Sequence, residues 1–246
     1  MAIVGVIDAE TGKPLAILDG TFLTALRTGA VSGKATELLA REDSKTLLSI
    51  GAGAQAFTQI WAVATARPGI ERILITSRTR ARAEGLVERL RAELPELGAR
   101  ASVADDLRAA TREADIICTA TNATEPLFDD ADLKPGAHIN AVGAYTPAMQ
   151  EVPPATVVRA YVVVDEVAAA LAEAGDLVKP LNAGLIDRAH IETELGQIAS
   201  GDKPGRTGAE QITFFKSVGN AVQDIAVARF AVERAEATGR GQRAEL

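Results

Sequence analysis

Short apolar runs rich in Val, Ile and Leu alternate with stretches of helical periodicity through the middle of the chain, and this alternation restricts the possible fold most strongly. Strands are predicted at 46–50, 72–76, 100–103, 115–118, 138–142 and 161–164, with helices at 55–66, 81–93 and 106–113. Strands separated by helices in this way form a parallel sheet covered on both faces. The runs are mostly apolar, as strands buried on both sides require. The sequence therefore predicts an α/β fold, a doubly wound parallel sheet of the Rossmann type.

Segments with other patterns flank this region. Runs 3–8 and 15–18 are joined by a turn-rich connection that contains Gly12. They predict a β-hairpin, either separate or at the edge of a larger sheet. A helix is expected over 21–41. After Asp165 the strand pattern weakens, and helices are expected near 166–174, 191–199 and 218–238.

Composition excludes several classes of protein. The net charge of −7 and the pI near 5.0 disfavour nucleic acid as a partner, because such proteins present a concentrated basic face. No apolar run reaches membrane-spanning length, and the first residues given lack the basic-then-apolar layout of a secretion signal. Cys118 is the single cysteine, and the two histidines, His138 and His190, offer no metal pair. We expect a cytoplasmic protein with no membrane partner and no metal site.

A glycine motif follows the first strand of the sheet. Gly51-Ala52-Gly53-Ala54-Gln55-Ala56 lies at a strand-to-helix turn, the setting of the dinucleotide-binding fingerprint. Gly51 would permit the tight turn, and Gly53 would let a pyrophosphate approach the backbone amides at the helix start. The alternative is a tight turn that binds no ligand. The surrounding strand–helix repeat favours the dinucleotide site.

The end of the second strand bears on the choice of cofactor. An NAD site usually has an acidic residue there, but this strand runs into Ser77-Arg78-Thr79. A guanidinium and hydroxyl groups can bind a 2′-phosphate, which a carboxylate would repel. We therefore favour NADP(H), with NAD(H) as the alternative. Arg78 and Arg80 would otherwise be solvated residues at a helix start.

Two more loops are expected at the carboxyl edge of the sheet, where ligands of open α/β sheets bind. Thr119-Ala120-Thr121 follows one strand, and its hydroxyl groups would donate to ribose or pyrophosphate, or else cap a turn. Val142-Gly143 ends the next strand, and Gly143 would let the nicotinamide ring come close. Cys118 has no basic neighbours in the local sequence, so it is interpreted as a buried strand residue.

Several segments, in chain order, resemble the ornithine cyclodeaminase/μ-crystallin family: TALRTGAVSGKATELLARED, LLSIGAGAQA, DIICTATN, LKPGAHINAVGAYTPAMQE, AGDL and ITFFKSVGNAVQD. The resemblance implies nicotinamide chemistry on amino or imino acids and a homodimer. It also implies a Rossmann domain over 29–211, with 1–28 and 212–246 belonging to a substrate and dimerisation domain.

The resemblance also assigns roles to single residues. Arg27 and Thr28 match an Arg-Thr pair that touches the pyrophosphate and the substrate carboxylate, although Arg27 could instead be a surface cation. Ala54, Gln55 and 77–79 match cofactor-binding positions. Ser217 matches a residue near the nicotinamide, and its alternative role is to cap the last helix.

Tyr145 stands where the cyclodeaminases of the family have an aspartate that handles the substrate amine. A phenol is neutral at pH 7 and cannot replace that carboxylate. We therefore expect an NADP(H)-dependent reductase of small cyclic imino acids such as pyrroline-2-carboxylate. Tyr145 would donate a proton or, as we favour, form a wall of the pocket. The alternatives are an NAD-dependent ornithine cyclodeaminase and an inactive, NADPH-binding μ-crystallin-like protein.

The resemblance further implies a segment ahead of the hairpin that holds part of the substrate sheet and two cations for the substrate carboxylate. The sequence begins almost at the hairpin. We interpret this as a start assigned too late, a truncated gene or the loss of part of the catalytic domain.

Overall fold

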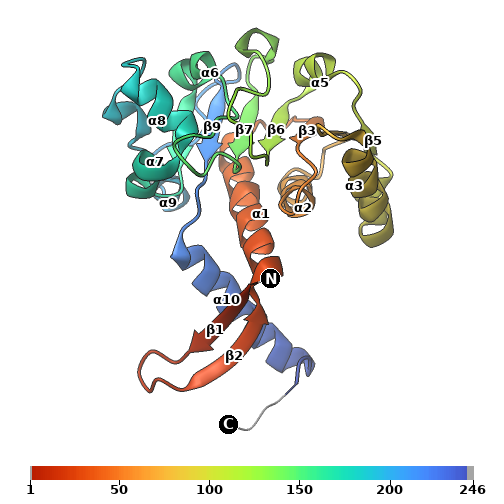
Figure 1. Cartoon of the computed structure of the whole chain (residues 1–246), viewed down its shortest axis with the longest axis vertical. Coiled ribbons are helices and arrows are strands. Elements are labelled where there is room, and N and C mark those ends of the chain that lie inside the picture. The colour runs from red at the N-terminus through yellow and green to blue at the C-terminus, as the bar shows by residue number, and fades with distance from the viewer. Residues whose placement is uncertain (1, 243–246) are drawn as a thin grey trace.

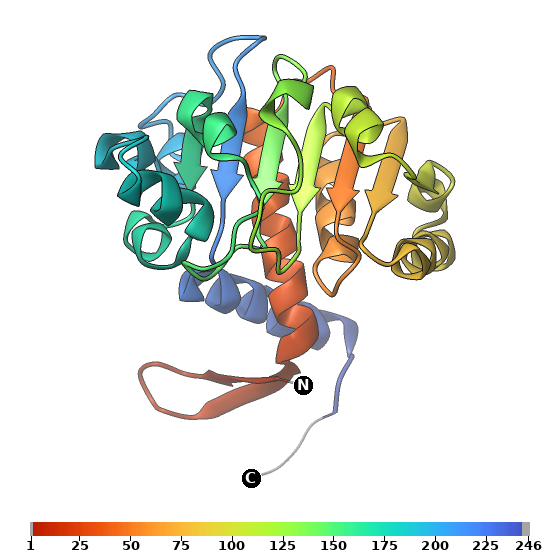
Figure 2. The ribbon, with the colours of Figure 1, turned by 45° about the horizontal axis from the view of Figure 1, so that its top comes forward.

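A seven-stranded, wholly parallel sheet forms the centre of the computed structural model, which describes residues 2–242 (Figures 1 and 2). The strand order is β5-β4-β3-β6-β7-β9-β8. The strands are β3 (Thr46–Ile50), β4 (Arg72–Thr76), β5 (Ala101–Val103), β6 (Ile116–Thr119), β7 (His138–Ala141), β8 (Tyr161–Val164) and β9 (Thr213–Lys216). The predicted α/β fold with a doubly wound sheet is confirmed, and the predicted strands agree to within one residue at either end.

Helices cover both faces of the sheet. Side chains such as Leu47, Ile73 and Ile116 point to one face, and their neighbours Leu48, Leu74 and Ile117 point to the other; both sets are buried. The helices are α1 (Gly20–Leu39), α2 (Ala56–Ala66), α3 (Arg80–Glu93), α4 (Pro95–Gly98), α5 (Leu107–Glu113), α6 (Pro154–Arg159), α7 (Val167–Glu173), α8 (Gly175–Asn182), α9 (Leu195–Ala199) and α10 (Ala221–Thr238). Within residues 2–242, no helix is both long and apolar enough to cross a bilayer.

Strand β9 was not foreseen as part of the sheet. It pairs in parallel with β7 on one side and β8 on the other. The expected boundary between residues 211 and 212 thus falls just ahead of a strand that lies inside the sheet. The strand ends in Lys216 and lies after Asp165, where the strand–helix alternation has weakened, so its sequence carries a weak strand pattern.

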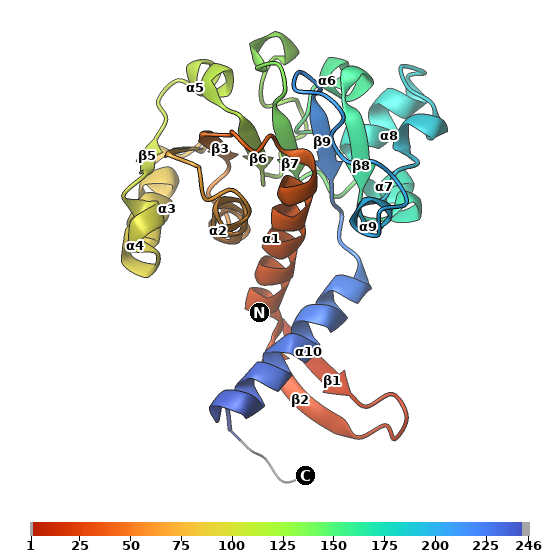
Figure 3. The same ribbon diagram turned by 180° about the vertical axis from the view of Figure 1, so that it is seen from behind.

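The hairpin, the first half of α1 and helix α10 extend away from the sheet (Figures 1 and 3). Strands β1 (Ile3–Ile7) and β2 (Pro14–Asp19) pair antiparallel as a two-stranded sheet of their own, so the hairpin is separate in the described residues. Asp19 caps α1 by accepting from the backbone N–H groups of Thr21 and Phe22. Helix α1 then continues without a break past the expected boundary at residues 28 and 29.

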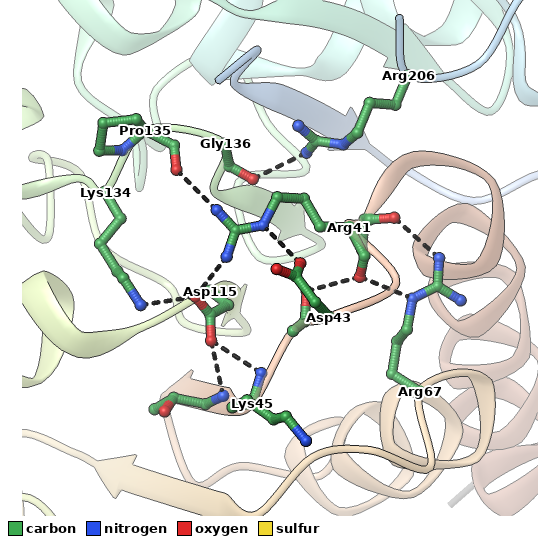
Figure 4. A network of polar contacts seen from close by, with 12 residues as sticks. Arg41, Asp43, Lys45, Arg67, Asp115, Lys134, Pro135, Gly136 and Arg206 are labelled. Atoms are coloured by element: carbon green, nitrogen blue, oxygen red, sulfur yellow. Dashed lines mark hydrogen bonds and ion pairs between the residues drawn. The ribbon is translucent and has the colours of Figure 1, made fainter. Parts of the chain in front are cut away.

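A buried carboxylate organises the amino-terminal edge of the sheet (Figure 4). Asp115 accepts from the backbone N–H groups of Lys45 and Thr46 at 2.8 and 3.0 Å, and it pairs with Arg41 and Lys134. Burial alone would raise its pKa, but the hydrogen bonds from Lys134 and the two amides outweigh burial and lower it. The network stabilises the edge opposite to the one where the glycine motif lies.

Candidate active site

The glycine motif forms the turn between β3 and α2. Gly51 is buried with φ of 109°, its N–H donates to the Thr76 carbonyl oxygen, and a Cβ there would lie 2.6 Å from the Ala120 carbonyl oxygen. Gly53 is exposed, and a Cβ added to it would meet no atom within 4 Å. The chain's own packing therefore requires glycine at position 51 but not at position 53. The open space beside Gly53, at the start of α2, fits a group that approaches the backbone from outside.

The loops singled out in the sequence lie together at the carboxyl edge. In register, Ile50 is level with Thr76 on one neighbouring strand and with Thr119 on the other, and Thr119 is level with Ala141. The strand order runs outward in opposite directions from β3 and β6, so the crevice between their ends is the topological switch point. Open α/β sheets bind their ligands in this position.

Helix α1 packs closely against α2, and this places the segment from Ala25 to Gly29 beside the first turn of α2. The Thr58 hydroxyl donates to the Ala25 carbonyl oxygen at 2.7 Å, and the Gln59 amide donates to the Thr28 carbonyl oxygen. A Cβ on Gly29 would lie 2.5 Å from the Thr58 carbonyl oxygen, so the two helices touch backbone to backbone. The Thr28 hydroxyl is directed into its own helix, where it donates to the Thr24 carbonyl oxygen.

Arg27 is oriented by helix α10. Its guanidinium lies 3.2 Å from the Asp224 carboxylate and donates to the Gln223 side chain, and its side chain is only 14% exposed. Its Nη1 and Nη2 atoms lie against Gly219, where a Cβ would come within 2.9 Å of them. The interpretation of Arg27 as a freely solvated surface cation is therefore wrong.

Ser217 follows β9 and lies in the same region as Arg27. Its hydroxyl donates to Asp165, whose same carboxylate oxygen also accepts from the Gly219 N–H. The alternative role of Ser217 as helix cap is wrong, because α10 begins after Asn220 and the Asn220 side chain accepts from the Val222 N–H. Ser217 instead shapes the turn that precedes α10.

The residues after β4 are placed at the adenine side of the predicted site. Ser77 is half-buried, whereas Arg78 and Thr79 are exposed. Arg80 pairs with Glu84 and Asp105, while Arg78 takes part in no ion pair within residues 2–242. The guanidinium of Arg78 is therefore available for an anion. Arg80 is a solvated, ion-paired residue at the start of α3, which was the alternative interpretation of both arginines.

The loops after β6 and β7 are held together by a residue that the sequence did not reveal. Glu151 is fully buried and accepts from Thr119, Thr121, Gly143 and Ala144. The structure thus gives the hydroxyl groups of Thr119 and Thr121 a protein partner. Burial, the largest cause, raises the pKa of Glu151, and Lys216 opposes the shift. No local pattern marks Glu151, because its partners come from two separate strands.

Two other residues complete the loop after β7. Val142 is half-buried at the strand end, and Tyr145 is half-exposed, with its backbone N–H donating to the Gly143 carbonyl oxygen. The Tyr145 ring faces solvent more than protein in the described residues. Its roles as pocket wall or proton donor both stay predictions.

Comparison with known proteins now adds to this geometry. Residues 1–239 match the model of the ornithine cyclodeaminase/mu-crystallin family. The chain belongs to this family. A Delta(1)-pyrroline-2-carboxylate reductase of Bacillus cereus is 46% identical over 245 residues, which cover 99% of this chain and 74% of that enzyme.

Solved structures of family members are also similar to this chain. The Delta(1)-pyrroline-2-carboxylate reductase of Thermococcus litoralis, in complex with NADH and L-proline, has a TM-score of 0.93 and 40% identity over 98% of this chain and 74% of its own. An archaeal alanine dehydrogenase dimer with bound NAD has a TM-score of 0.88 and 32% identity over 98% of this chain and 72% of its own. The sequence-based assignment to the ornithine cyclodeaminase/mu-crystallin family is confirmed.

The remaining reactive side chains have structural roles. Cys118 is buried, and burial raises the pKa of its thiol to about 12, which keeps it protonated. His138 is buried between Thr213 and Asn140, and burial lowers its pKa to about 3, so it is neutral. Within residues 2–242, no group of three or more His, Cys, Asp or Glu side chains is placed to hold a metal ion.

Proposed function

We propose that this chain is an NADP(H)-dependent reductase of small cyclic imino acids of the pyrroline-2-carboxylate type. The observation that most supports this proposal is that 98% of this chain is similar to a reductase whose structure contains NADH and L-proline. L-Proline is the product expected when the C=N bond of pyrroline-2-carboxylate is reduced. A bound nicotinamide would supply the hydride for that reduction.

The chain's own residues would bind and orient the reactants. The backbone N–H groups at the start of α2 would donate to the diphosphate oxygens beside the open space at Gly53, with Ala52, Ala54 and Gln55 lining the turn. Arg27 would hold an anionic group, the substrate carboxylate or the diphosphate, because Asp224 and Gln223 already fix its orientation. Thr28 would act through position, since its hydroxyl donates within α1 and its carbonyl oxygen accepts from Gln59, which holds α1 against α2.

The preference for NADP(H) over NAD(H) is supported by the residues that follow β4. Arg78 is exposed and free of ion pairs in the described part of the chain, and Ser77 and Thr79 flank it with hydroxyl groups. This set has donors and a positive charge for a 2′-phosphate. NADH and NAD are the cofactors bound in the two solved relatives, so NAD(H) is the competing choice in the test.

Imine reduction is preferred over cyclodeamination because of Tyr145. A neutral phenol at this position cannot serve as the base or counter-ion that a primary amine substrate needs. Reducing a C=N bond that already exists requires hydride and a proton only. The structure places Tyr145 on the loop with Gly143, next to the end of β7.

A homodimer is the oligomeric state we propose. Large apolar side chains are exposed on the hairpin and on α10, which together extend away from the sheet: Ile3, Ile7, Leu15, Ile17, Val222, Ile225 and Phe230. Exposed apolar surface of this kind marks an association site. The archaeal relative with bound NAD is a dimer.

The proposed activity is tested by mixing the protein with NADPH or NADH and pyrroline-2-carboxylate and following the absorbance of the reduced nicotinamide. Oxidation of NADPH in preference to NADH, with proline as product, is expected. Formation of proline and ammonia from ornithine with catalytic NAD would show a cyclodeaminase instead. Cofactor binding without either reaction would show a binding protein.

A further inference from the structure

Buried acidic and basic side chains connect the loops that end β6, β7 and β9. Glu151, Asp176 and Lys216 are each fully buried, although charged groups are rarely so. Removing charges from water is costly unless each one is well paired. The three side chains lie under the carboxyl edge of the sheet, directly beneath the candidate site, so we ask what they contribute to that site.

The Glu151 carboxylate receives donors from two loops at once. One oxygen accepts from the Thr119 hydroxyl and the Gly143 N–H, both at 2.8 Å. The other accepts from the N–H and the hydroxyl of Thr121, at 2.6 and 2.7 Å. The carboxylate therefore fixes the end of β6 against the end of β7. A Cβ on Gly143 would collide with Glu151 and with the Thr121 carbonyl oxygen, so glycine is required at this junction.

Asp176 and Lys216 fix the position of Glu151 in turn. One Asp176 oxygen accepts from the backbone N–H groups of Glu151 and Val152, at 2.7 and 2.9 Å. The other lies 3.2 Å from the Lys216 ammonium at the end of β9. The ion pair thus connects β9, the start of α8 and the segment that carries Glu151. These contacts fix the backbone that carries Glu151, so its carboxylate is held in place between the two loops.

The order of the strands indicates which part of the cofactor these loops face. Arg78 follows β4 and the glycine turn follows β3, so the adenine half and the diphosphate would occupy that side. The other half of the dinucleotide would then extend over β6 and β7. We infer that Glu151, held by the Asp176–Lys216 pair, is a positioning residue that shapes the nicotinamide half of the site and not the adenine half. This inference rests on the proposed function.

The test compares two ligands on the wild-type chain and on Glu151→Gln. The ligands are the preferred reduced dinucleotide and the matching ADP-ribose, which lacks the nicotinamide. Glutamine keeps the shape of the side chain but presents an NH₂ group to donors, so the two loops separate. We expect about tenfold weaker binding of the dinucleotide, since small displacements in a site have effects of this size or larger. Binding of ADP-ribose should stay within about twofold of wild type.

Asp115→Asn is the matched control. Asp115 is also a buried carboxylate that accepts from two backbone N–H groups and pairs with lysine, but it lies at the opposite edge of the sheet (Figure 4). The Asp115→Asn variant should have a lower melting temperature, but the ratio of its affinities for the dinucleotide and for ADP-ribose should equal that of wild type. The inference would be overturned if Glu151→Gln weakened the binding of both ligands equally, or weakened the binding of neither. It would also be overturned if Asp115→Asn showed the same selective loss of dinucleotide affinity.

Hydrogen exchange of the ligand-free protein gives a second measurement that does not depend on activity. Exchange at residues 119–123 and 142–145 should be faster in Glu151→Gln and unchanged in Asp115→Asn. If Glu151→Gln does not fold, Thr119→Val removes one donor to the same carboxylate and should give a smaller effect in the same direction. Failure of the wild-type chain to bind either ligand would refute the proposed function itself, whereas the exchange result bears on Glu151 alone.

Discussion

The two glycines of the turn between β3 and α2 should have separable roles. At Gly51, φ of 109° costs any other residue about 1–2 kcal/mol. An alanine Cβ would also lie 2.6 Å from the Ala120 carbonyl oxygen and 3.0 Å from the Thr121 methyl group, and such overpacking costs about 1–3 kcal/mol. Gly51→Ala should therefore lose about 2–5 kcal/mol of unfolding free energy, which lowers the melting temperature by roughly 4–20 °C in a chain of this size.

Gly53→Ala should behave in the opposite way. Its Cβ meets no atom within 4 Å, so the unfolding free energy should change by less than about 0.5 kcal/mol. The same Cβ would occupy the space through which a diphosphate approaches the backbone, and dinucleotide affinity should fall by about tenfold or more.

Thermal unfolding followed by circular dichroism, without cofactor, measures the first effect, and a fluorescence titration with NADPH and NADH measures the second. The reasoning is refuted if Gly53→Ala lowers the melting temperature as much as Gly51→Ala does. It is refuted equally if a folded Gly53→Ala protein binds the dinucleotide as tightly as wild type.

Other residues give further predictions. Arg78→Asp should shift the preference from NADPH toward NADH in the same titration, and an unchanged preference would remove Arg78 from the site. Asp115→Asn should lose about 2–4 kcal/mol of unfolding free energy at pH 7 in urea unfolding. Burial raises the pKa of folded Asp115, but the hydrogen bonds from Lys134 and the two amides outweigh it and hold the pKa below its ordinary 3.8. The stabilisation is therefore present above pH 3.8 and is lost as the pH falls through the folded pKa. The difference from wild type should shrink as the pH falls below about 3.8, and a constant difference there would contradict the assignment. Phe230→Glu should convert a dimer to monomers in size-exclusion chromatography with light scattering, while the same substitution at exposed Val158, on α6, should not.

Sequence periodicity was sufficient for the sheet because a strand buried on both faces leaves an apolar run that no surface segment imitates. Periodicity was insufficient for β9, which lies after the region of strand–helix alternation and ends in a lysine. That lysine is paired with Asp176 only through the tertiary fold. The division at residues 28 and 29 followed the family pattern and stays a prediction; the helix expected over 21–41 crosses it, as α1 does. Periodicity predicts individual helices and strands, but it does not predict how these elements pack together in the fold.

The sequence likewise singled out some residues of the candidate site and missed others. Gly51, Gly53 and the loops after β4, β6 and β7 were found because each follows a strand end, and the parallel sheet brings strand ends together. Glu151 was missed because its hydrogen bonds join residues from 7 to 32 positions away. The pairing of Arg27 with Asp224, 197 positions apart, is beyond any local pattern.

Helix α1 runs without a break from the hairpin to its contact with α2. Its 20 residues span about 30 Å, and at Gly29 its backbone touches α2 with no side chain between them. A rotation of the hairpin would therefore be transmitted along α1 to the helix start that faces the diphosphate, rather than absorbed at a joint. Changes that bend α1 ahead of Gly29 should therefore alter the angle between the hairpin and the sheet while leaving the contact between α1 and α2 in place.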